Sequence, residues 1–201
     1  MQTIRQRLHA LLLLAALTIS LAVPASAAGS LPFTDVDPSE WYYTYVQDLY
    51  DAGIVDGVTS TAFRPEGTVT FGQALKLVLM AAGYENQAPT GTHWASGFYD
   101  LAQREGLLPS GLNLGLDDAI TRLEIAEITV LAMDLSRTSQ DPSPFDDTDA
   151  EAALILWDHG IFEGSASGDQ ILFQPQDDIS RAEITTVIWR IYHYTPPESP
   201  E

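Results

Sequence analysis

The stretch Ile179-Ser180-Arg181-Ala182-Glu183 decides the fold, because its pattern occurs three times in the chain. The two counterparts are Ile120-Thr121-Arg122-Leu123-Glu124 and Val69-Thr70-Phe71-Gly72-Gln73. Each has a Ser or Thr three residues before a Glu or Gln, which is a capping box: the hydroxyl accepts from a helix amide and the longer side chain reaches back. Three helices are therefore predicted, with caps at Thr70, Thr121 and Ser180 and cap partners at Gln73, Glu124 and Glu183.

A glycine-flanked turn precedes each box. It reads Gly53-Ile-Val-Asp-Gly57 in the first copy, starts again at Gly106 and reads Gly160-Ile-Phe-Glu-Gly164 in the last. The residues before the first turn, Trp41 to Ala52, have their apolar side chains at helical spacing, and Gly53 is a natural helix stop. Each copy is therefore predicted to be a helix, a loop and a second helix.

Three such copies imply a shared core. A two-helix unit of this size cannot bury its apolar faces alone, so we expect the three to pack together as an all-α domain. The predicted repeats cover 31–84, 91–136 and 143–194, and a Pro-rich tail follows at 195–201.

The first 27 residues have the features of an export signal. Arg5 and Arg7 precede an apolar run that ends in the small residues of Ala25-Ser26-Ala27, and this order is typical of a cleaved secretory signal peptide. Residues 1–27 are therefore predicted to be removed, which leaves a secreted protein that does not insert into a membrane. The chain has no cysteine, which excludes disulfides and thiolate metal sites.

The chain is strongly acidic. It has nine Lys and Arg against 28 Asp and Glu; without residues 1–27 the counts are seven and 28, and 7 − 28 = −21. This charge argues against nucleic acid or an anionic membrane surface as a partner.

The motifs together resemble a known family. The order Phe33-Thr-Asp35, Trp41, the turn at 53–57, Phe63-Arg-Pro and then the box resembles the S-layer homology repeat, and the three copies cover essentially residues 33–194. The resemblance implies a pseudo-threefold helical bundle at the cell surface or cell wall. It also implies non-covalent binding of an anionic, often pyruvylated, cell-wall polysaccharide in grooves between repeats. The positions it assigns to these grooves are Arg122, Arg181, Asp35, Trp41, Trp94 and Asp147.

The two box arginines are the strongest candidates for ligand binding. Each stands in the first turn of a predicted helix, where the helix dipole disfavours a cation, and capping does not require Arg there. Free amides at a helix start, together with a guanidinium, would suit a carboxylate. The alternative is a salt bridge between each Arg and the abundant Asp and Glu.

The other four positions have structural interpretations too. Trp41 and Trp94 can stack on sugar rings or fill the core, and the core is favoured slightly. Asp35 and Asp147 are more typical of a closed turn than of a ligand contact.

The first copy departs from the pattern. Phe71, Gly72 and Gln73 stand where Arg, Ala and Glu would be, and Lys76 lies more than a turn further on. The first repeat is therefore predicted to serve as framework, with binding left to Arg122 and Arg181.

Enzyme and metal functions find no support in the sequence. His93, His159 and His193 belong to no catalytic or zinc motif, and a calcium loop starting at Asp147 would lack its glycine and its final Glu. We expect no cofactor, no metal site and no enzyme activity. The alternative function is a scaffold that assembles with other surface-layer proteins without binding glycan.

Overall fold

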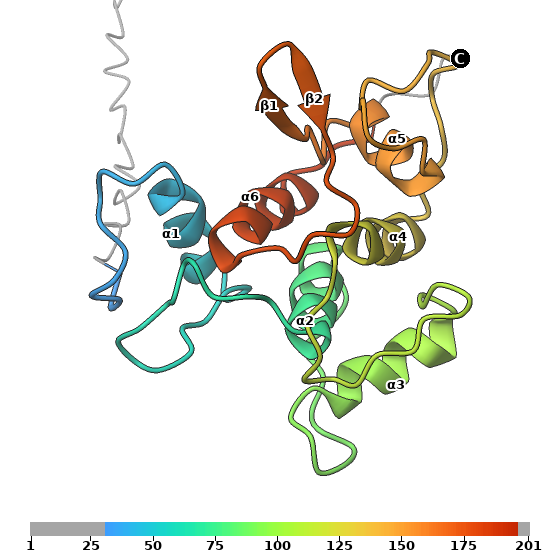
Figure 1. Ribbon diagram of the computed structural model, residues 1–201. Coiled ribbons are helices and arrows are strands. Elements are labelled where there is room, and N and C mark those ends of the chain that lie inside the picture. Colours follow the sequence, from blue (N-terminus) through green and yellow to red (C-terminus); the bar gives the residue numbers. More distant parts are fainter. Residues whose placement is uncertain (1–30, 197–201) are drawn as a thin grey trace, which may run out of the picture.

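Residues 31–196 are described by a computed structural model and are built mainly from helices. The expected signal peptide, 1–27, and residues 197–201 of the tail lie outside this part. The helices of the described part are α1 (Tyr43–Asp51), α2 (Phe71–Ala81), α3 (Ser96–Glu105), α4 (Arg122–Met133), α5 (Glu151–Asp158) and α6 (Arg181–Tyr192) (Figure 1). None of them is long and apolar enough to cross a bilayer.

One loop corrects the prediction of a purely helical fold. Strand β1 (Ser165–Ser167) pairs antiparallel with β2 (Gln170–Leu172), which leaves residues 168–169 as the turn. Gly168 has a φ of 63°, a conformation that tight hairpin turns use and that glycine adopts easily. The loop from Gly164 to Phe173 is longer than its counterpart from Gly57 to Phe63, and the extra length pairs with itself.

Capping boxes are present at the starts of α2, α4 and α6. At α6, the hydroxyl of Ser180 accepts from the amide of Glu183 at 3.2 Å, and the carboxylate of Glu183 accepts from the amide of Ser180 at 2.9 Å. One side-chain pair thus satisfies two groups that a helix start would otherwise leave without partners.

The extended stretches before these three helices pair with one another. β-bridges join Thr68 to Ser180, Thr70 to Ala119 and Thr121 to Asp178. The first two amides of each helix donate to carbonyl oxygens of a neighbouring stretch. The pairs are Phe71 to Asp118 and Gly72 to Leu116 in α2, Arg122 to Asp177 and Leu123 to Pro175 in α4, and Arg181 to Gly67 and Ala182 to Pro65 in α6.

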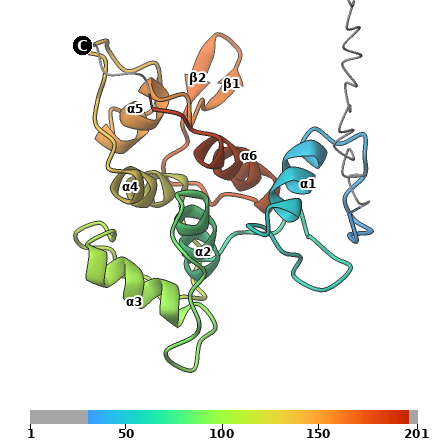
Figure 2. The same ribbon diagram turned by 180° about the vertical axis from the view of Figure 1, so that it is seen from behind.

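Helix α2 lies in the middle of the molecule (Figures 1 and 2). It contacts α3, α4 and α6, while α1 packs on α6 and α5 packs on α4. The backbones of α4 and α6 are not packed against each other in the described part of the chain, although the side chains of Arg122 and Glu183 meet between them. The helix contacts therefore do not by themselves form a closed threefold ring.

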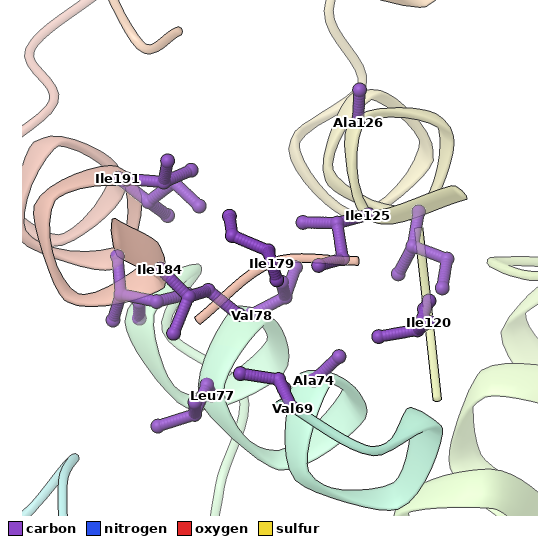
Figure 3. Close-up of a cluster of buried hydrophobic side chains, with 14 of the residues drawn as sticks. Val69, Ala74, Leu77, Val78, Ile120, Ile125, Ala126, Ile179, Ile184 and Ile191 are labelled. Atoms are coloured by element: carbon purple, nitrogen blue, oxygen red, sulfur yellow. The ribbon is translucent and has the colours of Figure 1, made fainter. Parts of the chain in front are cut away.

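The residue before each cap anchors the core. Val69, Ile120 and Ile179 are buried and lie between α2, α4 and α6, where Figure 3 shows them with side chains such as Val78 and Ile184. Burying a side chain of this size contributes about 1.5–3 kcal/mol. The three boxes and the central core are thus built from the same short stretches.

Candidate functional site

Two grooves on the protein each contain one of the box arginines. The first, the Arg181 groove, has a volume of about 320 Å³. It is lined by residues from four separate parts of the chain: Val55–Val58 with Phe63, Gln73 with Lys76 and Leu77, Trp94, and Arg181 with Ile184 and Thr185. The N-terminus of α6 therefore faces the turn after α1, one side of α2 and the residues just before α3.

The second groove, the Arg122 groove, has a volume of about 280 Å³. It is built from the start of α4, the turn after α5, one side of α6 and the residues before α1. Its lining residues are Trp41, Arg122, Phe162–Ser165, Ile179, Glu183, Thr186, Val187 and Arg190. Each groove thus combines a box arginine, a glycine turn, one side of a capped helix and a tryptophan.

Arg181 is buried, with 8% of its surface exposed. Its Nε donates to the carbonyl oxygen of Phe63 at 2.7 Å and its Nη2 to that of Asp56 at 2.8 Å, while the guanidinium lies 4.5 Å from the centre of the Phe63 ring. Among the described residues, its Nη1 makes no hydrogen bond. The side chain therefore joins α6 to the loop before α2 and keeps donors for a further partner.

Arg122 repeats this arrangement with one addition. It is 5% exposed, its Nε donates to the carbonyl oxygen of Phe173 at 2.7 Å, and its guanidinium lies 4.7 Å from the centre of the Phe162 ring. Its Nη1 lies 3.3 Å from a carboxylate oxygen of Glu183. Arg122 therefore has a counter-ion within hydrogen-bond distance.

These contacts give both arginines a structural role, since each bonds a distant loop carbonyl. They also correct the expectation of free amides at the helix starts. The helix-start amides are not free for a ligand, because neighbouring carbonyls occupy the first two and the capping hydroxyl takes another. Burial lowers the pKa of both guanidinium groups, and nearby carboxylates partly offset this. Arginine nevertheless stays protonated in proteins.

The two predicted tryptophans are on the surface, so the slight preference for a core position was wrong. Trp41 is 57% exposed and Trp94 is 45% exposed. Each precedes its helix by two residues instead of starting it, which leaves the ring outside the helix packing at a groove. An exposed indole beside a groove can stack on the apolar face of a sugar ring.

Asp35 and Asp147 hold the loops that the arginines bond. The carboxylate of Asp35 accepts from the amides of Phe63 and Arg64, both at 2.8 Å, and Asp147 accepts from Phe173 and Gln174 at 2.8 and 2.7 Å. Neither aspartate lines either groove. Burial acts to raise the pKa of Asp35, but the amide hydrogen bonds outweigh it and the pKa is lowered.

Residues of the predicted first repeat line both grooves. Phe71 is buried and lines neither groove, but Gln73 and Lys76 line the Arg181 groove and Trp41 lines the Arg122 groove. Lys76 also forms an ion pair with Asp56. Lys76 lies more than a turn beyond the box on its own helix, but it lines the same groove as Arg181, which is 105 residues further along the chain.

Sequence reasoning missed Arg190 and Thr186 as groove residues. Arg190 lies one turn beyond Thr186 on α6 and pairs with Glu163 at 2.5 Å. The Oγ1 of Thr186 is buried and has no hydrogen-bond partner in the described structure. Because cations are rare in this acidic chain, Arg190 could have been selected from the sequence as a candidate. Nothing in the sequence distinguishes Thr186 from other threonines.

Gly57 and Gly164, at the turns that line the two grooves, have no room for a side chain. A Cβ on Gly57 would lie 2.3 Å from the carbonyl oxygen of Thr59 and 2.5 Å from the Phe33 ring. We expect Gly57→Ala to lower the free energy of unfolding by about 2–3 kcal/mol, measured by urea denaturation. Gly91→Ala is the control, because a Cβ there meets nothing closer than 3.6 Å and should change stability little. Equal stability of both variants would contradict the clash.

A third cavity, of about 240 Å³, lies beside the linker 136–144. There the buried carboxylate of Asp158 accepts from Arg137 Nε at 2.6 Å and from the amides of Thr138 and Ser139 at 2.9 and 3.1 Å. These groups satisfy one another and hold the linker on α5. In residues 31–196 no group of three or more His, Asp or Glu side chains is placed to hold a metal ion.

A comparison with protein families identifies part of the chain. The family described as the S-layer homology domain matches residues 32–75. This segment contains Asp35 with the loop that it holds, the first glycine turn and the first capping box. Residues 32–75 are therefore similar to the S-layer homology domain. The match does not extend to the second and third boxes, so three tandem repeats remain a prediction.

The proteins to which this chain is similar are much longer than the chain itself. The chain is 28% identical to the surface-layer 125 kDa protein of Lysinibacillus sphaericus over 57% of its own length, and 31% identical to a cell surface protein of Thermoanaerobacter kivui over 51%. It is also 25% identical to an endoglucanase of Bacillus sp. (strain KSM-635) over 94% of its length. The chain spans 11%, 13% and 24% of these three proteins.

These comparisons indicate a secreted protein held at the cell surface. S-layer homology domains anchor proteins to the cell wall, and the surface-layer and cell-surface relatives fit that role. The relatives named as glucanases match through this non-catalytic region, and no catalytic domain is evident in the described residues.

Proposed function

We propose that the protein is a non-covalent anchoring module that binds an anionic cell-wall polysaccharide in the Arg181 and Arg122 grooves, and that its three helix pairs are repeats of one unit. The observation that carries this proposal is that both grooves contain the same combination of side chains. In each, a buried arginine with donors to spare lies in the same groove as an exposed tryptophan. Guanidinium groups bind anions, and aromatic faces bind the apolar faces of sugar rings.

A test of this proposal must separate binding from folding. The arginines bond distant loops, so their replacement would disturb the fold. Trp41 and Trp94 are exposed, and their removal should spare it. We expect Trp41→Ala and Trp94→Ala each to weaken binding to purified wall polysaccharide by about tenfold, since loss of a ring contact costs about 1.5 kcal/mol.

Binding is measured by isothermal titration and stability by thermal denaturation. Tyr192→Ala is the matched control, because Tyr192 is an exposed aromatic residue that lines neither groove. If the tryptophan variants bind the polysaccharide as tightly as Tyr192→Ala does, the proposed grooves are not the binding sites.

A scaffold without glycan affinity is the second candidate. It is favoured by the bonds from Arg122 and Arg181 to loop carbonyls, because these bonds explain the two arginines without a ligand. A scaffold predicts no saturable heat when wall polysaccharide is titrated into the protein.

A further inference from the structure

The two grooves have the same layout but different charge. In the Arg122 groove both cations have carboxylate partners: Arg122 lies 3.3 Å from Glu183, and Arg190 lies 2.5 Å from Glu163. In the Arg181 groove Lys76 is paired with Asp56. Arg181 itself donates only to carbonyl oxygens and forms no ion pair with a carboxylate in the described part of the chain.

One position accounts for most of this difference. The third residue of the capped helix lines each groove, and it is Glu183 in the Arg122 groove but Gln73 in the Arg181 groove. Both side chains complete a capping box. Only Glu183 has a second oxygen that neutralises an arginine. The charged groups lining the Arg181 groove thus sum to one positive charge, and those lining the Arg122 groove sum to zero.

The Arg122 groove also contains an unused hydroxyl. Thr186 Oγ1 is buried without a partner, and it stands at the place on its helix where the Arg181 groove has Lys76. A buried hydroxyl without a hydrogen bond is costly, and a sugar hydroxyl could satisfy it. The second groove is therefore suited to a neutral, hydroxyl-rich ligand.

We propose that the grooves divide the polysaccharide between them: the Arg181 groove takes a carboxylate-bearing sugar and the Arg122 groove takes an uncharged one. This inference rests on the proposed function. A planar carboxylate matches the free edge of a guanidinium, and Arg181 has that edge without a competing anion. Elsewhere the acidic protein repels anions, which further favours the groove with surplus positive charge.

Two exchanges between the grooves test the division while keeping the capping boxes. Gln73→Glu gives the Arg181 groove the carboxylate of its counterpart, and Glu183→Gln removes that carboxylate from the Arg122 groove. Glu and Gln both serve in capping boxes of this chain, so both variants should fold, as checked by thermal denaturation.

The ligand is a set of short fragments of wall polysaccharide from the producing bacterium, used before and after chemical reduction of their carboxylates to alcohols. Gln73→Glu is expected to lower the affinity for the unreduced fragments, measured by isothermal titration, by about tenfold. It places a negative charge in the groove that receives the carboxylate. Binding of the reduced fragments should change little. Glu183→Gln is expected to raise the number of carboxylate-dependent sites from one to two.

The outcomes separate this inference from the function on which it rests. If the unmodified protein binds neither fragment, the proposed function fails. If it binds but Gln73→Glu has no effect, or weakens reduced and unreduced fragments equally, the division between grooves is overturned. Loss of the carboxylates without any effect on binding to the unmodified protein also overturns it.

Discussion

Arg181→Ala is expected to lower the free energy of unfolding by about 3–4 kcal/mol, because hydrogen bonds from a charged donor contribute about 1.5–3 kcal/mol each. Two such bonds are lost, to the carbonyl oxygens of Phe63 and Asp56, together with the packing of the guanidinium on the Phe63 ring. The lost bonds connect segments that are 118 residues apart, since Arg181 begins α6 and Phe63 precedes α2. Urea denaturation followed by far-ultraviolet circular dichroism measures the free energy of unfolding.

An exposed arginine provides the control. The side chain of Arg104 is 64% exposed and, among residues 31–196, pairs only with its neighbour Glu105, so Arg104→Ala should change stability by less than about 0.5 kcal/mol. Arg181→Lys should lie between the two, because a lysine ammonium cannot reproduce the planar fork. A result in which Arg181→Ala is as mild as Arg104→Ala would mean that the two loop hydrogen bonds contribute little.

Asp158→Asn is expected to destabilise the protein by about 2–3 kcal/mol at neutral pH, because it breaks a buried ion pair and weakens two amide hydrogen bonds. The side chain of Asp158 is 3% exposed. Burial acts to raise its pKa, but the hydrogen bonds from Arg137 and from the amides of Ser139 and Thr138 outweigh this and lower the pKa.

The lowered pKa sets the pH dependence. A carboxyl group with a lower pKa in the folded state stabilises the protein above its unfolded pKa, near 3.9, and loses this effect as the pH falls through the folded value. The difference in unfolding free energy between the unmodified protein and Asp158→Asn should therefore be constant from pH 7 to about pH 5 and shrink in stronger acid. Thermal melts over this range measure it, with exposed Asp51→Asn as control. A difference that stays the same down to pH 2 would show that the charge of Asp158 is not its source.

Much of the secondary structure could be predicted because it depends on neighbours along the chain. The cap at Thr121 and its partner Glu124 are three residues apart, and their hydrogen bonds form within one helical turn. The hairpin at 165–172 was missed because its short strands are largely exposed and lack an alternating apolar pattern. Its turn at Gly168 has the same composition as the other loops.

The candidate site could be predicted only in part. Arg122 and Arg181 were identified from their place in a repeated motif, but their partners are 51 and 118 residues away in the chain, at Phe173 and Phe63. No periodicity or spacing relates positions so far apart. The place of Trp94 at the Arg181 groove likewise depends on three other segments that come together there, at 55–63, 73–77 and 181–185.

The box Ile179-Ser180-Arg181-Ala182-Glu183 shows where the boundary between sequence and structure lies. Its sequence was sufficient for the helix start, because capping is a local exchange of hydrogen bonds between Ser180 and Glu183. The roles of Arg181 as a bond to a distant loop and of Glu183 as the counter-ion of Arg122 required the tertiary structure. The physical reason is distance along the chain: local geometry follows from adjacent residues, whereas groove charge depends on which segments the folded core brings together.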